Sequence, residues 1–174
     1  AIAGGSVRVP GFPAGSIQAD LALLPILERM GCRVARGAES LEVVAPEGTL
    51  RGVDVDMNAL PDAALALAVV ALFAQGPTRI RNVANLRIKE TDRLAATVTE
   101  LRRCGVDATE TDDGMRIVPP APGEIHGATI RTYDDHRMAM SFAILGLRVP
   151  GITIADPACV TKTFPGFFEL WDEL

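Results

Sequence analysis

Hydrophobic positions along the 174-residue chain alternate between helical and strand spacing. Leu21, Leu24 and Leu27 recur every third position and predict one apolar face of a helix over 17–30, which Gly31 would cap. Short apolar runs predict strands at 7–9, near 34, at 41–44 and at 53–55. A helix entered at Pro61 is apolar on every side, so we expect it at the centre of the fold, with Gly76-Pro77 ending it.

The rest of the chain repeats this order of elements. The pattern predicts strands at 78–83, 106–109, 115–118, 128–131 and 152–154, helices at 91–104 and 134–147, and one more helix in the tail 163–174. The order amounts to about two β-α-β-α-β-β units. It indicates an α/β fold in which short sheets cover buried helices.

The two units also resemble each other in sequence. The segment 27–34 resembles 101–106, with Gly31 and Gly105 lying 74 positions apart. At the same offset, 61–63 aligns with 135–137 and Ile80 with Ile154. A repeat of this length indicates a duplicated supersecondary unit. We therefore expect a single domain over 1–174, in which the loop 119–123 is only a connection.

Composition excludes several classes of protein. A 48% hydrophobic and 22% charged chain is typical of a folded globular protein. The longest apolar stretch, 63–74, is shorter than the about 20 residues that a membrane helix needs, so we expect no membrane association. The opening at Ala1, without Met or a signal peptide, suggests a processed or excised piece. Three dispersed cysteines without a CxxC pair favour reduced thiols and a cytoplasmic location.

Charge is distributed unevenly along the chain. The net charge of −5 argues against a nucleic-acid partner. The segment 79–103 nevertheless carries seven basic against three acidic residues. Such a cationic strip favours a small anionic ligand, although a solvated helix face has the same appearance.

Candidate chemistry lies where strands lead into helices. Asp62, the run 89–93, the pair 136–137 and Lys162 all occupy such positions. If the duplicated units stack in parallel, these helix N-termini converge and form a site for phosphate or carboxylate. Arg93 and Arg137 oppose the helix dipole unless an anion lies beside them. Each feature also has an ordinary structural explanation: a first-turn carboxylate, a solvated helix start or a core histidine.

Familiar cofactor motifs do not occur in the sequence. There is no GxxxxGK[ST] or GxGxxG phosphate loop, and two histidines with scattered cysteines make no zinc set. Their absence narrows the range of possible functions.

Four ordered segments, 56–64, 82–93, 133–140 and 156–165, resemble the C-terminal half of the EPSP synthases, a family of enolpyruvyl transferases. The resemblance runs from Gly4 to Leu174, and the block Arg87-Ile88-Lys89-Glu90-Thr91-Asp92-Arg93 is its most specific part. It implies an inside-out α/β barrel domain of β-α-β-α-β-β units around buried parallel helices. This chain would be the C-terminal domain, with about two units and a tail, and the N-terminal domain would be missing.

The resemblance also implies a reaction and its residues. The enolpyruvyl group of phosphoenolpyruvate would pass to the 5-hydroxyl of shikimate 3-phosphate, with release of phosphate. The resemblance implies neither a metal nor an organic cofactor. Asp62 would bind the shikimate ring and deprotonate the 5-hydroxyl, Glu90 would be the acid and base at the methylene carbon, and Lys89 would contact shikimate and donate a proton. Asn85 would bind a shikimate hydroxyl. Four basic residues would hold phosphoenolpyruvate: Arg93, Arg137, Lys162 and His136.

The expected partners are these two substrates and the missing N-terminal domain, without which half a cleft should not turn over. Two alternatives stay open at this point. One is a UDP-N-acetylglucosamine enolpyruvyl transferase, which shares the fold but usually lacks the block at 89–93. The other is a stand-alone anion-binding module.

Overall fold

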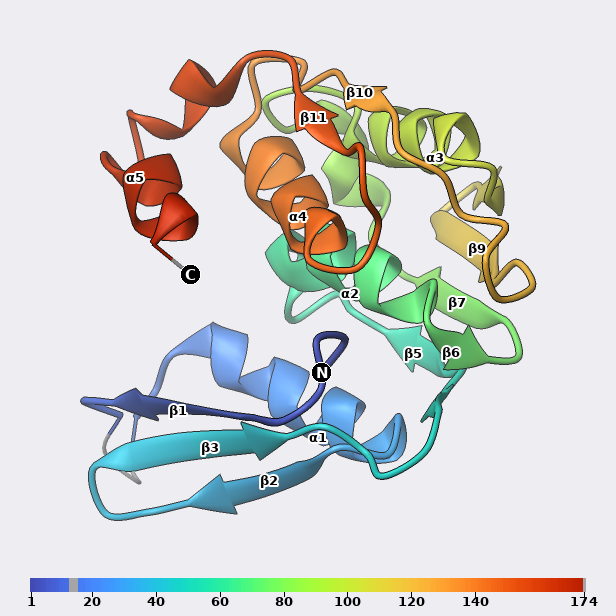
Figure 1. The fold of residues 1–174 in the computed structure, drawn as a ribbon. Coiled ribbons are helices and arrows are strands. Elements are labelled where there is room, and N and C mark those ends of the chain that lie inside the picture. The colour runs from blue at the N-terminus through green and yellow to red at the C-terminus, as the bar shows by residue number, and fades with distance from the viewer. Residues whose placement is uncertain (13–15, 174) are drawn as a thin grey trace.

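In the described part of the first half, the chain forms a three-stranded sheet, two α-helices, two 3-10 helices and four further short strands (Figure 1). The computed structural model describes residues 1–12 and 16–173. In chain order the elements are β1 Ser6–Pro10, the 3-10 helix η1 Ala19–Ala22, α1 Leu23–Arg29, β2 Arg33–Arg36, β3 Ser40–Val44, β4 Leu50–Arg51, β5 Asp54–Asp56, η2 Pro61–Ala63, α2 Ala64–Ala71, β6 Ala74–Gln75 and β7 Thr78–Arg81.

The second half repeats the helices and the β2-β3 hairpin of the first half, has fewer short strands, and ends in the expected C-terminal helix. Its elements are η3 Ala84–Ile88, α3 Arg93–Arg103, β8 Asp107–Thr111, β9 Gly114–Val118, β10 Thr129–Ile130, α4 His136–Gly146, β11 Thr153–Ile154, η4 Pro157–Val160 and α5 Phe167–Asp172. The last residue of the predicted tail, Leu174, lies outside the described residues.

The duplication predicted from the sequence is present in the backbone. β3 and β9 begin and end 74 positions apart, and Gly31 and Gly105 both adopt left-handed φ angles, of 109° and 85°. Only glycine takes this conformation without strain, which explains the glycine after each surface helix. α1, β2 and β3 are thus the counterparts of α3, β8 and β9.

The offset changes in the second part of each unit. Gly52 and Gly76 have their counterparts in Gly127 and Gly151, 75 positions later, because the loop before Gly127 contains one additional residue. The caps that end α2 and α4, Leu72 and Leu147, are also 75 apart. The sequence alignment of 61–63 with 135–137 was therefore wrong by one position, and the counterpart of Asp62 is Arg137.

The two units share one sheet. Its strand order is β5-β7-β9-β8, so the parallel pair β5/β7 of the first unit continues into the antiparallel hairpin of the second. Three smaller sheets, β1-β3-β2, β4-β6 and β10-β11, cover other sides of the molecule. The α/β class with short sheets around buried helices is confirmed.

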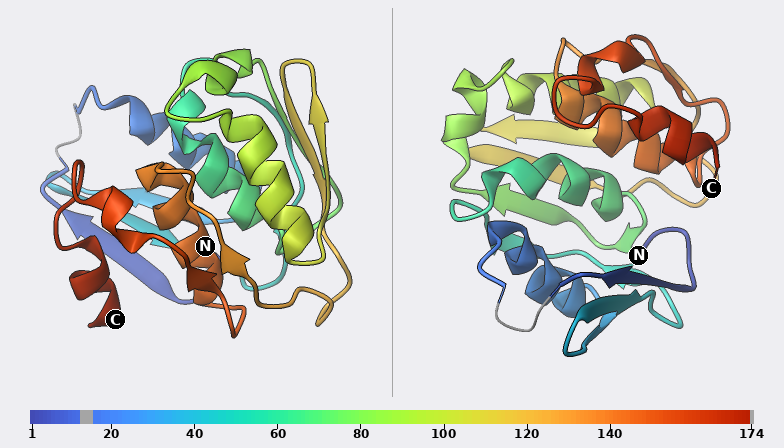
Figure 2. Two further views of the ribbon diagram at one scale, coloured as in Figure 1. Left: turned by 90° about the horizontal axis from the view of Figure 1, so that it is seen from above. Right: turned by 90° about the vertical axis from the view of Figure 1, so that its left-hand side faces the viewer.

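α2 lies at the centre of the molecule, as its apolar sequence predicts. Six of its eight residues are buried, and it packs against α4. Figures 1 and 2 show α2 between the β1-β3-β2 sheet and α4. One apolar core extends from Ile2 to Val149 through both units.

Two helix boundaries differ from the prediction by five residues or more. The first helix becomes α-helical only at Leu23, after the 3-10 helix η1, because Pro25 lacks an N–H and is tolerated only in a first turn. α2 ends at Ala71 and not at Gly76, because Ala74–Gln75 leaves the helix to pair with β4.

No helix in the described part of the chain is long and apolar enough to cross a membrane. Cys32, Cys104 and Cys159 are buried as free thiols.

Candidate functional site

Arg93, the first residue of α3, joins three carboxylates from different parts of the fold. Its guanidinium is 1% exposed. Nε donates to Asp135 Oδ2 at 2.6 Å, and Nη2 donates to Asp135 Oδ1 at 3.2 Å and to Glu90 Oε2 at 2.8 Å. Nη1 donates to Asp62 Oδ1 at 2.9 Å. We call Arg93, Arg137, Asp62, Glu90 and Asp135 the Arg93 network.

The start of α3 fixes the position of Arg93. Asp92 is the N-cap, and its Oδ1 accepts a hydrogen bond from the Ala95 amide at 3.0 Å. Arg87 of η3 donates from Nη1 to Asp92 Oδ2 at 3.0 Å and to Glu110 Oε2 at 2.8 Å. The segment that carries Lys89 and Glu90 is therefore held at both ends, by Arg87 and by the helix cap.

The start of α4 supplies the buried side of the network. Asp135 is the N-cap of α4, and its Oδ1 accepts from the Arg137 amide at 2.8 Å. Burial alone would raise the pKa of Asp135, but hydrogen bonds from Arg93 and from the Arg137 amide outweigh burial and lower this pKa. Asp135 is thus a buried, ionised partner of Arg93.

Asp62 and Glu90 form the exposed side of the network. Asp62, in η2 directly before α2, accepts from Arg93 through Oδ1 and pairs with Arg137 Nη2 through Oδ2 at 3.1 Å. The side chains of Asp62, Glu90 and Arg137 are 37%, 32% and 35% exposed, whereas that of Asp135 is completely buried. Two carboxylates are therefore open to solvent while a common guanidinium fixes both of them.

The predicted convergence of helix N-termini is confirmed for α2, α3 and α4. Asp62, Arg93 and Arg137 come from these three helix starts, and Asp62 contacts both arginines. Both arginines lie at the positive ends of helix dipoles, where a cation is unfavourable. Carboxylates of the chain itself offset this unfavourable position.

His136, the first residue of α4, is 7% exposed. Its Nδ1 has no hydrogen-bond partner among the described residues. Burial lowers the pKa of His136 below its usual value, so the imidazole is neutral at neutral pH.

Besides His136, three further predicted site residues lie outside the network. Asn85 belongs to η3, Lys89 follows it, and Lys162 follows η4; all three are exposed. Within the described part of the chain, none of them forms a hydrogen bond or ion pair with the network.

Asp135 was not among the predicted site residues. An Asp directly before a helical segment is typical of an N-cap, and that ordinary explanation concealed its second role as the partner of Arg93. The contact joins residues 42 positions apart, which local sequence patterns do not show.

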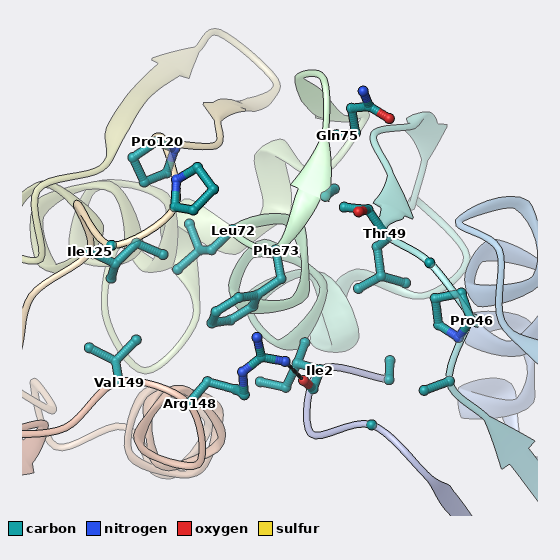
Figure 3. Close-up of a pocket in the computed structure, with 18 of the residues that line it drawn as sticks. Ile2, Pro46, Thr49, Leu72, Phe73, Gln75, Pro120, Ile125, Arg148 and Val149 are labelled. Atoms are coloured by element: carbon teal, nitrogen blue, oxygen red, sulfur yellow. Dashed lines mark hydrogen bonds between the residues drawn. The ribbon is translucent and has the colours of Figure 1, made fainter.

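A cavity of about 910 Å³ lies at the opposite ends of α2 and α4 (Figure 3). Arg148 is the one charged side chain among its lining residues in the described chain, and it donates to the Ile2 carbonyl and lies 5.1 Å from the Phe73 ring centroid. This cation is already paired, so we do not assign the anion site to the cavity. Among the described residues there is also no group of three or more potential metal ligands arranged for an ion.

Solved structures define the class of fold. The EPSP synthase from Acinetobacter baumannii matches 98% of this chain and 42% of its own, with a TM-score of 0.80 and 32% identity. The enolpyruvyl transferase NikO from Streptomyces tendae matches 98% of this chain and 39% of its own, with a TM-score of 0.76 and 25% identity. The fold is that of the enolpyruvyl transferases.

Sequence comparison defines the family. The family model of EPSP synthase (3-phosphoshikimate 1-carboxyvinyltransferase) matches residues 1–171, and the chain belongs to this family. It is 50% identical to the 3-phosphoshikimate 1-carboxyvinyltransferase of Serratia proteamaculans over 97% of this chain and 39% of the relative. It is 49% identical to the enzyme of the same name from Thiobacillus denitrificans, over 100% of this chain and 41% of the relative. The chain thus spans about 40% of the length of such relatives.

Proposed function

We propose that this chain forms one wall of the active site of a 3-phosphoshikimate 1-carboxyvinyltransferase. The reaction transfers the enolpyruvyl group of phosphoenolpyruvate to the 5-hydroxyl of shikimate 3-phosphate and releases phosphate. The observation that carries the proposal is the Arg93 network, in which Asp62 and Glu90 face solvent while one buried guanidinium fixes both. Two separately oriented carboxylates suit a reaction with proton transfers at two places, the 5-hydroxyl and the methylene carbon.

Asp62 and Glu90 divide these proton transfers in the proposal. Asp62 accepts the 5-hydroxyl proton as that oxygen bonds to C2 of phosphoenolpyruvate, and Glu90 donates a proton to C3. In the second step the bond from C2 to the phosphate oxygen breaks, phosphate leaves, and Glu90 takes a proton from C3 to restore the double bond. Lys89, next to Glu90 and exposed, is a further proton donor and a contact for shikimate 3-phosphate.

Phosphoenolpyruvate binding falls to the basic residues at the helix starts. Arg137 is partly exposed and offers bidentate hydrogen bonds to a carboxylate, while Lys162 supplies a second cation at the surface. Arg93 already uses four of its five N–H groups within the network, so a ligand carboxylate reaches it through the remaining N–H or by displacing Asp62 or Glu90. Neutral His136 contributes a hydrogen bond without adding charge.

The remaining part of the whole enzyme supplies the other wall of the cleft. The open edge of β1 supports this proposal. In the described structure β1 pairs only with β3, whereas β7, its counterpart in the four-stranded sheet, is paired with a strand on each side. All five residues of β1 are exposed. We place the whole enzyme in the cytoplasm, which three free, buried cysteines support.

The test is a chimera in which this chain replaces the matching segment of the Serratia proteamaculans enzyme. The chimera should release phosphate from phosphoenolpyruvate only when shikimate 3-phosphate is present. Glu90→Gln should lower the rate by about 10²–10⁴-fold, the contribution of a general acid or base. The exposed Thr99→Ala serves as the control on the neighbouring helix.

Two outcomes would contradict the proposal. A folded chimera that turns over UDP-N-acetylglucosamine in place of shikimate 3-phosphate would indicate the related transferase. A folded chimera that binds phosphate without turnover, and equally well with Glu90→Gln, would indicate an anion-binding module.

A further inference from the structure

Glu100 is a buried acidic residue outside the Arg93 network. It lies in α3 and is completely buried. Its Oε1 accepts a hydrogen bond from the Tyr133 hydroxyl at 2.8 Å, and its Oε2 accepts from the Arg131 amide at 3.1 Å. Arg103 Nη1 lies 3.6 Å away, on the exposed side. Both carboxylate oxygens are therefore used to hold the segment that precedes α4.

That segment has an unusual backbone. Tyr133 and Asp134 are consecutive non-glycine residues with φ angles of 57° and 55°. This left-handed conformation is rare for any side chain and especially for a bulky one, so it persists only where its surroundings hold it. The turn leads directly to Asp135, whose amide donates to the Thr132 carbonyl at 3.0 Å.

One face of α3 holds both ends of this turn. Arg93 and Glu100 are seven residues apart, which is two helical turns, so they lie on the same face of the helix. Glu100 binds the start of the turn through Arg131 and Tyr133, and Arg93 binds its end through Asp135. The geometry of the turn therefore depends on the same helix that positions Arg93.

The first unit has no such arrangement. Ile26 lies 74 positions before Glu100 and is buried in the apolar core. The segment between β5 and α2 contains no residue in the left-handed region. The repeat can therefore fold without a buried carboxylate at this position, which argues that Glu100 serves the site and not the architecture.

We propose that Glu100 is a positioning residue for the reaction. By holding the Tyr133–Asp134 turn it sets the start of α4, so that Asp135 meets Arg93 and Arg137 meets Asp62. Its effect on catalysis rests on the proposed function, whereas its effect on the turn does not.

The kinetic test compares variants of the full-length enzyme that carries this chain. Glu100→Ala should lower kcat/KM by about 10²-fold, the loss that a displacement of about 1 Å can cause. Tyr133→Phe removes the hydrogen bond from a half-exposed hydroxyl to Glu100 and should lower kcat/KM about tenfold. In the Glu100→Ala background the same substitution should have no further effect, because both changes break the same contact. The KM for phosphoenolpyruvate, which Arg137 binds, should rise, while the KM for shikimate 3-phosphate should not.

The conservative variant separates position from charge. In Glu100→Gln the amide oxygen can accept from the Arg131 amide and the amide nitrogen can donate to the Tyr133 oxygen, so near wild-type kinetics are expected. Thr99→Ala, exposed on the same helix, should change nothing. A Gln variant as impaired as the Ala variant, or an equal rise in both KM values, would overturn the proposal.

A second measurement does not depend on activity. Amide hydrogen exchange at Arg137, whose N–H binds Asp135, should become at least tenfold faster in Glu100→Ala, while exchange within α3 stays unchanged. If the wild-type enzyme releases no phosphate, the proposed function fails but exchange still tests the positioning role. Unchanged exchange at Arg137 would refute that role even in an active enzyme.

Discussion

The two repeated units share their helices and hairpins but differ in where they place charge. Their surface helices, hairpins and buried helices match in order, and both use a glycine after the surface helix. Arg93 and Glu100, however, have Ala19 and Ile26 as counterparts 74 positions earlier. The shared pattern of apolar residues and glycines therefore determines the fold, and the buried charges of the second unit are additions to it.

One pair of counterparts meets in the folded chain. Asp62 and Arg137 occupy matching positions at the starts of α2 and α4, and their side chains form an ion pair at 3.1 Å. Duplication has thus placed two equivalent helix starts beside each other, and opposite charges at the equivalent positions hold them together. Ion pairs that are partly open to solvent contribute little to stability, so we attribute the charged copy to function.

The largest expected effect comes from removing the central guanidinium. Arg93→Met should lower the free energy of unfolding by about 3–5 kcal/mol, because Asp135 would remain buried without its partner. Urea denaturation of the chain measures this change. Arg116→Met, at an exposed position of β9, is the control and should change stability by less than about 0.5 kcal/mol. Equal effects of the two substitutions would show that the network is not coupled to folding.

The second prediction tests what the two units share. A Cβ at Gly52 would lie 2.3 Å from the Pro77 carbonyl oxygen, and one at Gly127 would lie 2.5 Å from the Pro150 carbonyl oxygen. Gly52→Ala and Gly127→Ala should each lower the free energy of unfolding by about 1–3 kcal/mol, as overpacking does.

Gly48 provides the control for these two substitutions. A Cβ there meets no atom within 4 Å, so Gly48→Ala should leave the denaturation midpoint unchanged or raise it. A large loss at only one of the two glycines would show that the close approach of strands is not a common requirement of the units.

The same comparison explains how much the sequence could predict. Periodic apolar residues and the glycines at 31 and 105 are local signals, and the class of fold and most elements followed from them. The convergence of helix starts followed from the repeat. The contacts of Arg93 did not follow, because Asp135 and Asp62 lie 42 and 31 positions away and each has an ordinary explanation as a helix-start carboxylate.

A third prediction concerns acid stability in the second unit. The pKa of Asp135 is lower in the folded chain than its ordinary value of 3.8, so the ionised form stabilises the fold. This stabilisation is complete at pH values above the pKa of the unfolded chain, and it is lost as the pH falls through the lower pKa of the folded chain. In Asp135→Asn the free energy of unfolding should therefore be lower at pH 7, and the difference from the wild type should shrink below about pH 4. A difference that stays constant from pH 7 to pH 3 would contradict this linkage.

The smallest expected effect concerns the two histidines. Burial lowers the pKa of His136 below 6.5, so the unfolded chain binds a proton more readily than the folded one as the pH falls below that value. The free energy of unfolding should then decrease between pH 6.5 and 5.5 by less than about 1.4 kcal/mol, the limit for one proton per pH unit. His136→Gln should remove this decrease, whereas His126→Gln, which changes an exposed histidine, should retain it. His136 begins α4, and its counterpart in the first unit is Pro61, so the imidazole is a feature of the second unit alone. If the decrease persists in His136→Gln, another group titrates, and the difference between the two helix starts does not cause the pH dependence.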